Sequence, residues 1–218
     1  MTDGGNGERD SSESAGGNDT EATTANGGEK SLRWQTDGRE SAYACPGFSI
    51  VHEDVTLPDG TETDFDYLHD GPSVVVLPFT PDGELVVIEE WRQAVKRVVR
   101  GFPSGGVEPS ESLPDAAHRE LVEETGYEAA DVRHLDTFEP ATGITDAVFH
   151  YFVATACEPT GHQNLDDDET IRVATSTLEA MVDRLVTGDL GDGRTALGLL
   201  RYVLDEMEQV TLRPPGVE

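Results

Sequence analysis

Three glutamates in the segment 105–127, Glu120, Glu123 and Glu124, are the residues of this chain whose types and spacing most clearly indicate chemistry. On a helix these side chains would share one face. Glu120 and Glu124 would lie one turn apart, with a rise of about 6 Å along the axis. Two carboxylates at that separation can bracket Mg²⁺ or Mn²⁺, which prefer oxygen ligands. The spacing therefore predicts a divalent-metal site.

The residues at both ends of this segment predict the helix that would carry the glutamates. Ser112 is a favourable N-cap, and Pro114 is tolerated in a first helical turn. Gly126 stands where a left-handed residue would end the helix. We therefore expect one short helix over Leu113–Thr125, with Gly126 in a structural role.

Residues before the helix strengthen the prediction of a metal site. Gly105 and Gly106 let the backbone turn tightly, which would bring carbonyls of the preceding loop toward the same cations. The alternative is an ordinary solvated acidic helix, in a chain that is acidic throughout. Such a helix has no reason to carry two glycines, a distant Glu111 and an intervening Arg119 in one register, so we favour the catalytic interpretation.

The charge balance limits the classes of partner. The 218 residues include 44 acidic and 15 basic side chains, a formal net charge of −29. Nucleic acids and anionic membranes need clustered Lys and Arg, so neither is expected as a partner. This charge favours a protein of a salt-rich cytoplasm, where the Debye length falls to about 3 Å at 1 M salt.

The remaining composition is that of a soluble protein. The two cysteines, Cys45 and Cys157, make no disulfide framework. The chain shows neither a signal-peptide pattern nor an apolar run of membrane-spanning length. We therefore expect an intracellular, cytoplasmic protein.

Composition divides the chain into four parts. Residues 1–30 are polar and acidic, which predicts a disordered tail. We favour a solubilising leader over a binding segment as its role. Residues 31–70 alternate around the turn Pro58–Gly60 and predict a β-hairpin module too small to stand alone. Residues 71–213 form the expected main domain, and 214–218 a C-terminal tail.

The main domain predicts strands followed by helices. Val74–Phe79 and Leu85–Trp91 predict a hairpin around Pro81–Gly83. Further strands are expected over 132–138, 148–156 and 171–174, and closing helices over 178–186 and 196–207. The helical spacing of the last segment predicts four core residues, namely Leu197, Leu200, Leu204 and Met207.

A group of arginines precedes the acidic helix. Arg92, Arg97 and Arg100 lie close together in a chain that is poor in bases. Guanidinium groups pair bidentately with phosphate oxygens, so these residues predict a diphosphate site. Surface salt bridges are the alternative, given equal weight for Arg97 and Arg100. We take Arg92 and Arg100 as substrate-binding candidates, with Gly105 and Gly106.

The segment 105–127 resembles the Nudix box, the signature of the Nudix hydrolases, at every fixed position. Its flanks, Trp91–Gln93, Phe102–Gly106 and Glu169–Val173, are similar to the ADP-ribose pyrophosphatase branch of that family. The resemblance covers about residues 31–212. It implies an α/β/α sandwich around a mixed sheet, and a homodimer formed through the N-terminal β-module.

The resemblance also implies roles for particular residues. The Ser104 carbonyl, Glu120, Glu124 and Glu169 would ligate Mg²⁺, with Glu123 assisting. Arg119 would orient the glutamates, and Glu111 would brace the loop against the helix. The catalytic base of the family aligns with Asp167; because Asp reaches less far than Glu, the alternatives are Asp166, Asp168, a metal-bound hydroxide, and then Glu123 or Glu139.

The implied reaction is metal-assisted attack of water on a nucleoside diphosphate linked to another group, using two or three Mg²⁺ ions roughly 3.5–4 Å apart. ADP-ribose, giving AMP and ribose 5-phosphate, is the leading substrate, and a nucleotide-sugar such as GDP-mannose is the alternative. The chain departs from the branch at Gly101, where a Glu is usual, and at 142–147. A non-catalytic nucleotide-sensing Nudix domain and a protein acting through its acidic tail are the other hypotheses.

Overall fold

The computed structural model of the chain describes residues 32–166 and 169–212. The expected tails, residues 1–30 and 214–218, and the proposed base Asp167 lie outside the described residues. Among the described residues, 32–39 and 53–65 belong to one compact unit, and 40–52, 66–166 and 169–212 belong to a second.

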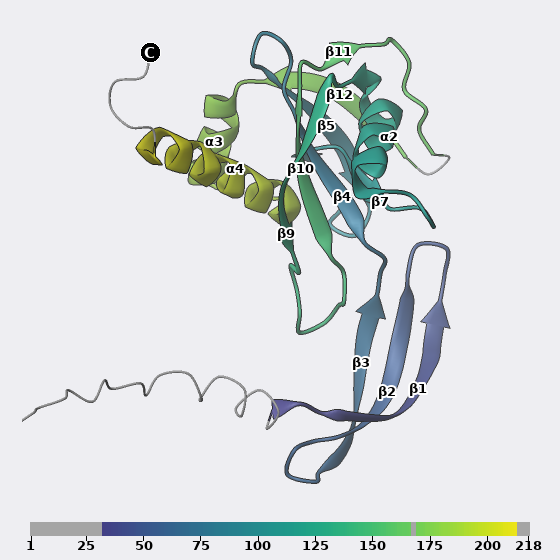
Figure 1. The fold of residues 1–218 in the computed structure, drawn as a ribbon. Helices are drawn as coiled ribbons and strands as arrows, with labels where there is room; N and C mark the ends of the chain where they lie inside the picture. Colours follow the sequence, from purple (N-terminus) through teal and green to yellow (C-terminus); the bar gives the residue numbers. More distant parts are fainter. Residues whose placement is uncertain (1–31, 167–168, 213–218) are drawn as a thin grey trace, which may run out of the picture. The chain divides into compact units, whose positions relative to one another are not determined.

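The N-terminal strands form one three-stranded sheet. β1 (Gln35–Ala44), β2 (Ser49–Thr56) and β3 (Glu62–His69) lie in the order β1-β2-β3 (Figure 1). The predicted turn at Pro58–Gly60 joins β2 to β3. Gly60 has φ 86°, and its amide donates to the Leu57 carbonyl at 2.9 Å. This left-handed conformation is one that glycine adopts at little cost, which explains the turn residue.

A mixed four-stranded sheet forms the centre of the second unit, with the order β7-β4-β10-β9. Its strands are β4 (Ser73–Pro78), β7 (Ser104–Gly106), β9 (Asp131–Phe138) and β10 (Phe149–Thr155). β10 pairs in parallel with β4 and antiparallel with β9. A short ribbon pairs β8 (Tyr127–Glu128) with β11 (Glu158–Pro159).

A second, antiparallel sheet has the order β12-β5-β6. Its strands are β5 (Leu85–Arg92), β6 (Arg97–Gly101) and β12 (Ile171–Ser176). The predicted hairpin of β4 and β5 is therefore wrong as a strand pairing. The turn forms, with Gly83 at φ 81°, but the described strands share one isolated bridge, Phe79 to Leu85. Instead, β4 pairs with β7 and β10, and β5 pairs with β12 and with the next strand, β6.

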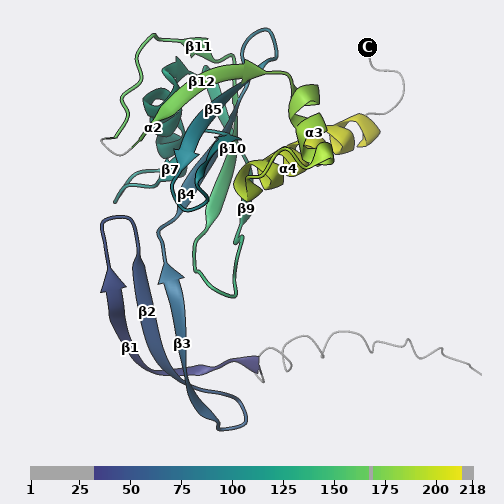
Figure 2. The same cartoon turned by 180° about the vertical axis from the view of Figure 1, so that it is seen from behind.

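Helices cover both faces of the mixed sheet (Figures 1 and 2). α2 (Leu113–Thr125) packs on the face that carries Val74 and Val76. α3 (Leu178–Thr187) and α4 (Gly193–Leu212) pack on the face that carries Val75 and Leu77. Alternate residues of a strand point to opposite faces, so β4 contributes to two cores. The predicted α/β/α sandwich around a mixed sheet is confirmed.

The helix α4 buries a different face from the predicted one. Leu200, Leu204 and Met207 are 49%, 52% and 60% exposed, whereas Leu199 is fully buried. Leu197 is partly buried against the core, as predicted. The helix is apolar over more than one stripe, so spacing alone did not identify the stripe that packs. No helix among the described residues is long and apolar enough to cross a membrane.

Candidate active site

The helix α2 begins and ends where the sequence predicts. The Ser112 hydroxyl accepts a hydrogen bond from the Asp115 amide, and Gly126 adopts φ 67° with its amide bound to the Val122 carbonyl. A Cβ at Gly126 would also lie 3.0 Å from backbone atoms of His162. Capping at both ends therefore fixes which residues of α2 point inward.

Two of the three glutamates of α2 are buried beside the β7 strand. Glu120 is 8% exposed and Glu124 is 2% exposed. The amide of Ser104, itself buried, donates to Oε2 of Glu124 at 2.9 Å. A Cβ at Gly105 would lie 2.2 Å from the carboxylate of Glu120, so only glycine allows this approach of strand and helix. The two carboxylates and the backbone of β7 are thus in close contact.

Arg119 contacts three glutamates, Glu111, Glu120 and Glu123, and does not contact the more deeply buried Glu124. Its Nε and Nη2 donate to the two carboxylate oxygens of Glu111, both at 2.9 Å. Its Nη1 donates to Glu120 at 2.6 Å and to Glu123 at 3.0 Å. Its Nη2 also donates to the Gly106 carbonyl at 2.7 Å. These contacts tie the glycine loop to α2; the orienting role of Arg119 stays a prediction.

The buried carboxylates carry more negative charge than nearby cations balance. Burial, together with the charges of Glu120 and Glu169, raises the pKa of Glu124 to about 8 against the opposing effect of the Ser104 amide. Burial also raises the pKa of Glu120, although Arg119 opposes this. A divalent cation would supply the missing positive charge. The hard oxygen donors present therefore fit the divalent cation that the resemblance implies.

The late acidic loop is held against the end of α2. The Asn164 amide donates to the Glu123 carbonyl at 2.9 Å, and Nε2 of Gln163 donates to the Glu124 carbonyl at 2.6 Å. Glu169, which is half-buried, accepts from the Asp166 amide at 3.0 Å. Its charge raises the pKa of both Glu120 and Glu124. The described residues on both sides of 167–168 therefore lie near α2.

The predicted substrate-binding arginines are engaged with glutamates of β5. Arg92 pairs with Glu90 at 2.8 Å. Arg100 pairs with Glu89 at 2.5 Å, and Arg172 contacts the same carboxylate. Arg97 donates to the Gly191 carbonyl at 3.0 Å. Arg100 thus forms a salt bridge, which was the alternative to phosphate binding. The phosphate-binding roles of Arg92 and Arg100 stay predictions.

Two residues beside the site were not identified from the sequence. Glu90 is 9% exposed, and its charge raises the pKa of Glu124. A charged residue at a buried position of an apolar strand is a sequence signal that could have identified Glu90. Arg194 lies in the first turn of α4, where its Nη1 donates to Oγ of Ser104 at 3.2 Å. No local pattern connects residues so far apart in the chain.

The space around Gly101 explains the departure from the expected branch at this position. A Cβ there would lie 2.8 Å from Oγ1 of Thr195 and 3.5 Å from Oδ2 of Asp192. A glutamate at position 101 would therefore displace the start of α4. The other departure, Asp146, accepts hydrogen bonds from the Asp70 amide and pairs with His69 at 2.6 Å.

An apolar pocket of about 500 Å³ lies in the same unit as the glutamates. Its lining is mostly apolar, with a few polar groups, and includes Ile50, Tyr67, Leu68, Pro140, Ile144 and Phe149. A pocket of this size is typical of small-molecule sites.

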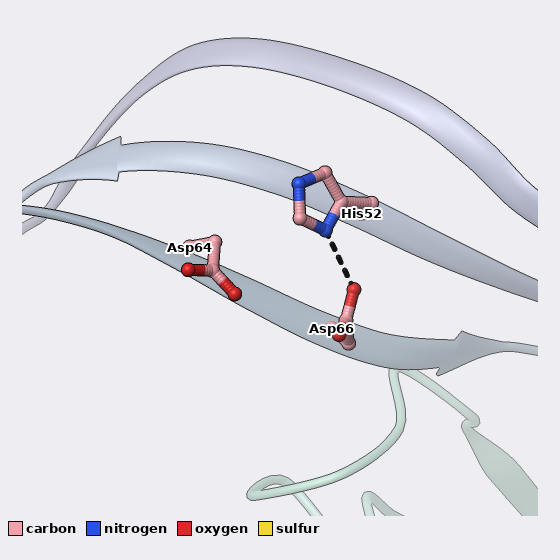
Figure 3. Close-up of side chains that lie close together, drawn as sticks. All are labelled: His52, Asp64 and Asp66. Atoms are coloured by element: carbon pink, nitrogen blue, oxygen red, sulfur yellow. Dashed lines mark hydrogen bonds and ion pairs between the residues drawn. The ribbon is translucent and has the colours of Figure 1, made fainter.

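A second group of side chains of the types that ligate metals lies on the N-terminal strands (Figure 3). Nδ1 of His52 on β2 is 2.8 Å from Oδ1 of Asp66 on β3, and Asp64 precedes Asp66 by two residues on that strand. The side chain of Asp66 is 58% exposed. An exposed His–Asp pair is common without a metal, so the buried carboxylates of α2 remain the candidate metal site.

Comparisons with known proteins agree with this geometry. The NUDIX domain family matches residues 69–191, more than half of the chain. The ADP-ribose pyrophosphatase of Bacillus subtilis (strain 168) is 29% identical over 181 residues, covering 83% of this chain and 98% of that protein. The ADP compounds hydrolase NudE of Escherichia coli (strain K12) is 27% identical over 158 residues, covering 71% and 84%.

A third relative and a solved structure extend the comparison. The GDP-mannose pyrophosphatase of Escherichia coli (strain K12) is 29% identical over 143 residues, covering 60% of this chain and 72% of that protein. A crystal structure of an ADP compounds hydrolase superposes with a TM-score of 0.71 at 23% identity, covering 84% of this chain and 97% of that one. The fold, the site and the family match together show that the chain belongs to the Nudix family and is a Nudix hydrolase.

Proposed function

We propose that the protein hydrolyses the pyrophosphate bond of ADP-ribose to give AMP and ribose 5-phosphate. The observation that carries the proposal is the burial of Glu124, which has no ion pair among the described residues, together with Glu120 beside the glycine loop. Such a cluster is suited to a cation-bound diphosphate. The relatives named for ADP-ribose and ADP compounds support the choice of substrate.

The chain's own residues would act on the substrate in defined ways. Glu120, Glu124, Glu169 and the Ser104 carbonyl would hold Mg²⁺, with Glu123 assisting. When bound, Mg²⁺ neutralises the diphosphate and makes the attacking water more acidic. Arg119 would keep Glu120 and Glu123 in their bound rotamers through its hydrogen bonds. Gly105 and Gly106 would let the loop backbone approach the phosphates.

The proton of the attacking water needs an acceptor near the cluster. We assign this role to Asp167, which lies outside the described residues, because it aligns with the base of the family. The attachment of residues 163 and 164 to α2 supports a base from this loop. Asp166 and Asp168 are the neighbouring alternatives, and Glu123 or Glu139 would follow if variants of all three aspartates remain active.

The apolar pocket of about 500 Å³ is proposed as the place of the nucleobase, since Phe149 and Tyr67 offer aromatic surface there. GDP-mannose remains the second candidate substrate, because one relative is named for it and the chain differs from the expected branch at Gly101. A nucleotide-sensing domain without turnover would bind these compounds but leave them intact.

We further propose a homodimer in a salt-rich cytoplasm. Exposed large apolar side chains, such as Trp34 and Leu204, support a covered surface in the assembly. The net charge of −29 supports the salt-rich setting. Light scattering in 2 M KCl would measure the mass, and a monomer at working concentration would contradict the dimer.

A hydrolysis screen in molar KCl tests the reaction. ADP-ribose, GDP-mannose and other nucleoside diphosphate derivatives are incubated with Mg²⁺, with Mn²⁺ or with EDTA, and products are separated by ion-exchange chromatography. AMP and ribose 5-phosphate, formed with metal and absent with EDTA, are the expected result. Binding of ADP-ribose without turnover, under every metal condition, would instead identify a sensing domain.

A further inference from the structure

Arg194 is fixed next to the candidate metal ligands. Its Nη1 donates to Oγ of Ser104 at 3.2 Å, and the amide of that same serine donates to Glu124. The backbone of Arg194 is also held, because the Tyr151 hydroxyl donates to its carbonyl at 3.1 Å. At the next residue, Thr195 donates to Asp192 through both its amide and its hydroxyl. The start of α4 therefore presents this side chain to the site in a set position.

The charge of Arg194 is not matched by a carboxylate in direct contact. Around the same site, Arg119 contacts three glutamates, Arg92 pairs with Glu90 and Arg100 pairs with Glu89. Within residues 32–166 and 169–212, Arg194 has a neutral hydroxyl and an aromatic ring as its side-chain partners and no ion pair within 4.0 Å. Its guanidinium group has five N–H donors. The hydrogen bond to the Ser104 hydroxyl uses one of these donors.

Arg194 lies beside both regions that a nucleotide substrate would occupy, namely the candidate metal ligands and the apolar pocket. Its guanidinium carbon lies 5.6 Å from the centre of the Phe149 ring, and Phe149 lines the apolar pocket. Arg194 also lines one narrow cavity with Glu90, Arg92 and Asp192. That cavity holds little more than a water molecule, so a phosphate would meet the guanidinium from the side of Ser104 and Phe149.

We propose that Arg194 binds a non-bridging oxygen of the substrate diphosphate and so positions it between the metal ligands and the apolar pocket. This inference rests on the proposed hydrolysis of a nucleoside diphosphate derivative. A pre-positioned guanidinium group that has no carboxylate in direct contact favours a phosphate, because the resulting hydrogen bonds are charge-assisted. The contact would be equally strong in the bound substrate and in the transition state. Loss of Arg194 should therefore weaken binding and leave the chemical step unchanged.

The test compares Arg194→Met and Arg194→Lys with Arg201→Met, a matched loss of an α4 arginine that pairs with Asp136 away from the site. For Arg194→Met we expect KM for ADP-ribose to rise about 10- to 100-fold with kcat within about threefold of wild type. Arg194→Lys should restore part of the loss, and Arg201→Met should keep the wild-type KM.

Two further measurements separate positioning from support of the metal loop. The Mg²⁺ concentration for half-maximal rate should stay within about twofold in Arg194→Met, because the proposed contact is to phosphate. Titration calorimetry with Mg²⁺ and inorganic pyrophosphate should show the same loss of affinity as KM. An unchanged KM and pyrophosphate affinity would overturn the inference, as would a KM change accompanied by an equal change in Mg²⁺ requirement.

Failure of the proposed function gives a different result. If wild type hydrolyses no nucleoside diphosphate derivative, the calorimetric comparison still decides about Arg194. Tighter binding of pyrophosphate by wild type than by Arg194→Met would then support a phosphate site without the reaction. Equal or absent binding in both proteins would overturn the phosphate contact itself.

Discussion

Two sets of glutamates, Glu89 on β5 and the pair Glu120 and Glu124 on α2, have opposite electrostatic surroundings. Glu89 on β5 accepts from Arg100 and Arg172, whose hydrogen bonds lower its pKa. Glu120 and Glu124 on α2 are buried with raised pKa values, and Arg119 reaches only the first of them. The first set is electrically complete within the protein, and the second set is not.

This difference separates a structural ion pair from a functional cluster in a chain where acids are abundant. A carboxylate that is matched by guanidinium groups needs nothing from solution. Buried carboxylates that repel one another are costly unless a cation joins them. The unmatched set is therefore our candidate site for a divalent cation, and perturbed pKa values of this kind are typical of active sites.

Glu124→Gln should break the activity and leave the fold intact. The amide is isosteric and can still accept from the Ser104 amide, but a charged metal ligand is lost. We expect kcat/KM to fall by about 10³-fold or more in a steady-state assay with saturating Mg²⁺.

Glu89→Gln is the matched control for that variant, since it removes a carboxylate of the electrically complete set. It should keep kcat within about threefold and lose roughly 1 kcal/mol of unfolding free energy. Near-normal activity in a folded Glu124→Gln protein, or an equal loss of activity in both variants, would contradict the distinction.

The sequence predicted the part of this distinction that depends on local spacing. Helix α2 has the predicted bounds because its caps, Ser112 and Gly126, act on adjacent residues. The need for glycine at position 105 was predicted as a close approach of the loop, and its nearest neighbour is the Glu120 carboxylate. Motifs within one helix and its loop are readable because few other arrangements satisfy them.

Contacts between distant segments were not readable in the same way. The pairing of β4 with β10 replaces the expected hairpin, since strand partners depend on the whole sheet. The buried stripe of α4 includes Leu199 and excludes Leu200, although both fit a helical period. Arg194 meets Ser104 only through the tertiary fold. The charge balance of each glutamate depends on such contacts.

The stability of the metal-free protein should fall as pH rises. The pKa of Glu124 is about 8 in the folded state, above the value near 4.5 of the free side chain. The folded state therefore binds more protons between these values, so this stabilisation is complete below about pH 4.5 and is lost toward pH 8. Chemical denaturation in EDTA should show a loss of roughly 3–5 kcal/mol from pH 5 to pH 8.

Two comparisons sharpen that measurement. Glu124→Gln should remove most of the pH dependence, because the uncharged amide does not titrate in this range. Added Mg²⁺ should stabilise wild type more at pH 8 than at pH 6, since it binds the deprotonated carboxylates. A flat wild-type profile in EDTA would show that the cluster is matched within the protein after all.

Salt should stabilise the protein as a whole, because the excess of acids extends over the entire chain. The net charge of −29 repels itself unless ions screen it. We expect the melting temperature to rise by on the order of 10 °C between 0.1 M and 2 M KCl, measured by calorimetry. NaCl should act nearly as well if screening is the cause. A constant melting temperature would remove the salt-rich interpretation and leave the enzyme assignment unaffected.

Glu90 shares features with both sets of glutamates, and its substitution should have the smallest effect on activity. It pairs with Arg92, as Glu89 pairs with Arg100, yet it is buried and its charge raises the pKa of Glu124. Removing that charge in Glu90→Gln should weaken attraction of the cation without removing a ligand. We expect the Mg²⁺ concentration for half-maximal rate to rise about three- to tenfold, with kcat nearly unchanged. Glu84→Gln, an exposed change before the same strand, should match wild type. A loss of kcat as large as that of Glu124→Gln would place Glu90 among the metal ligands, and an unchanged Mg²⁺ requirement would place it with Glu89.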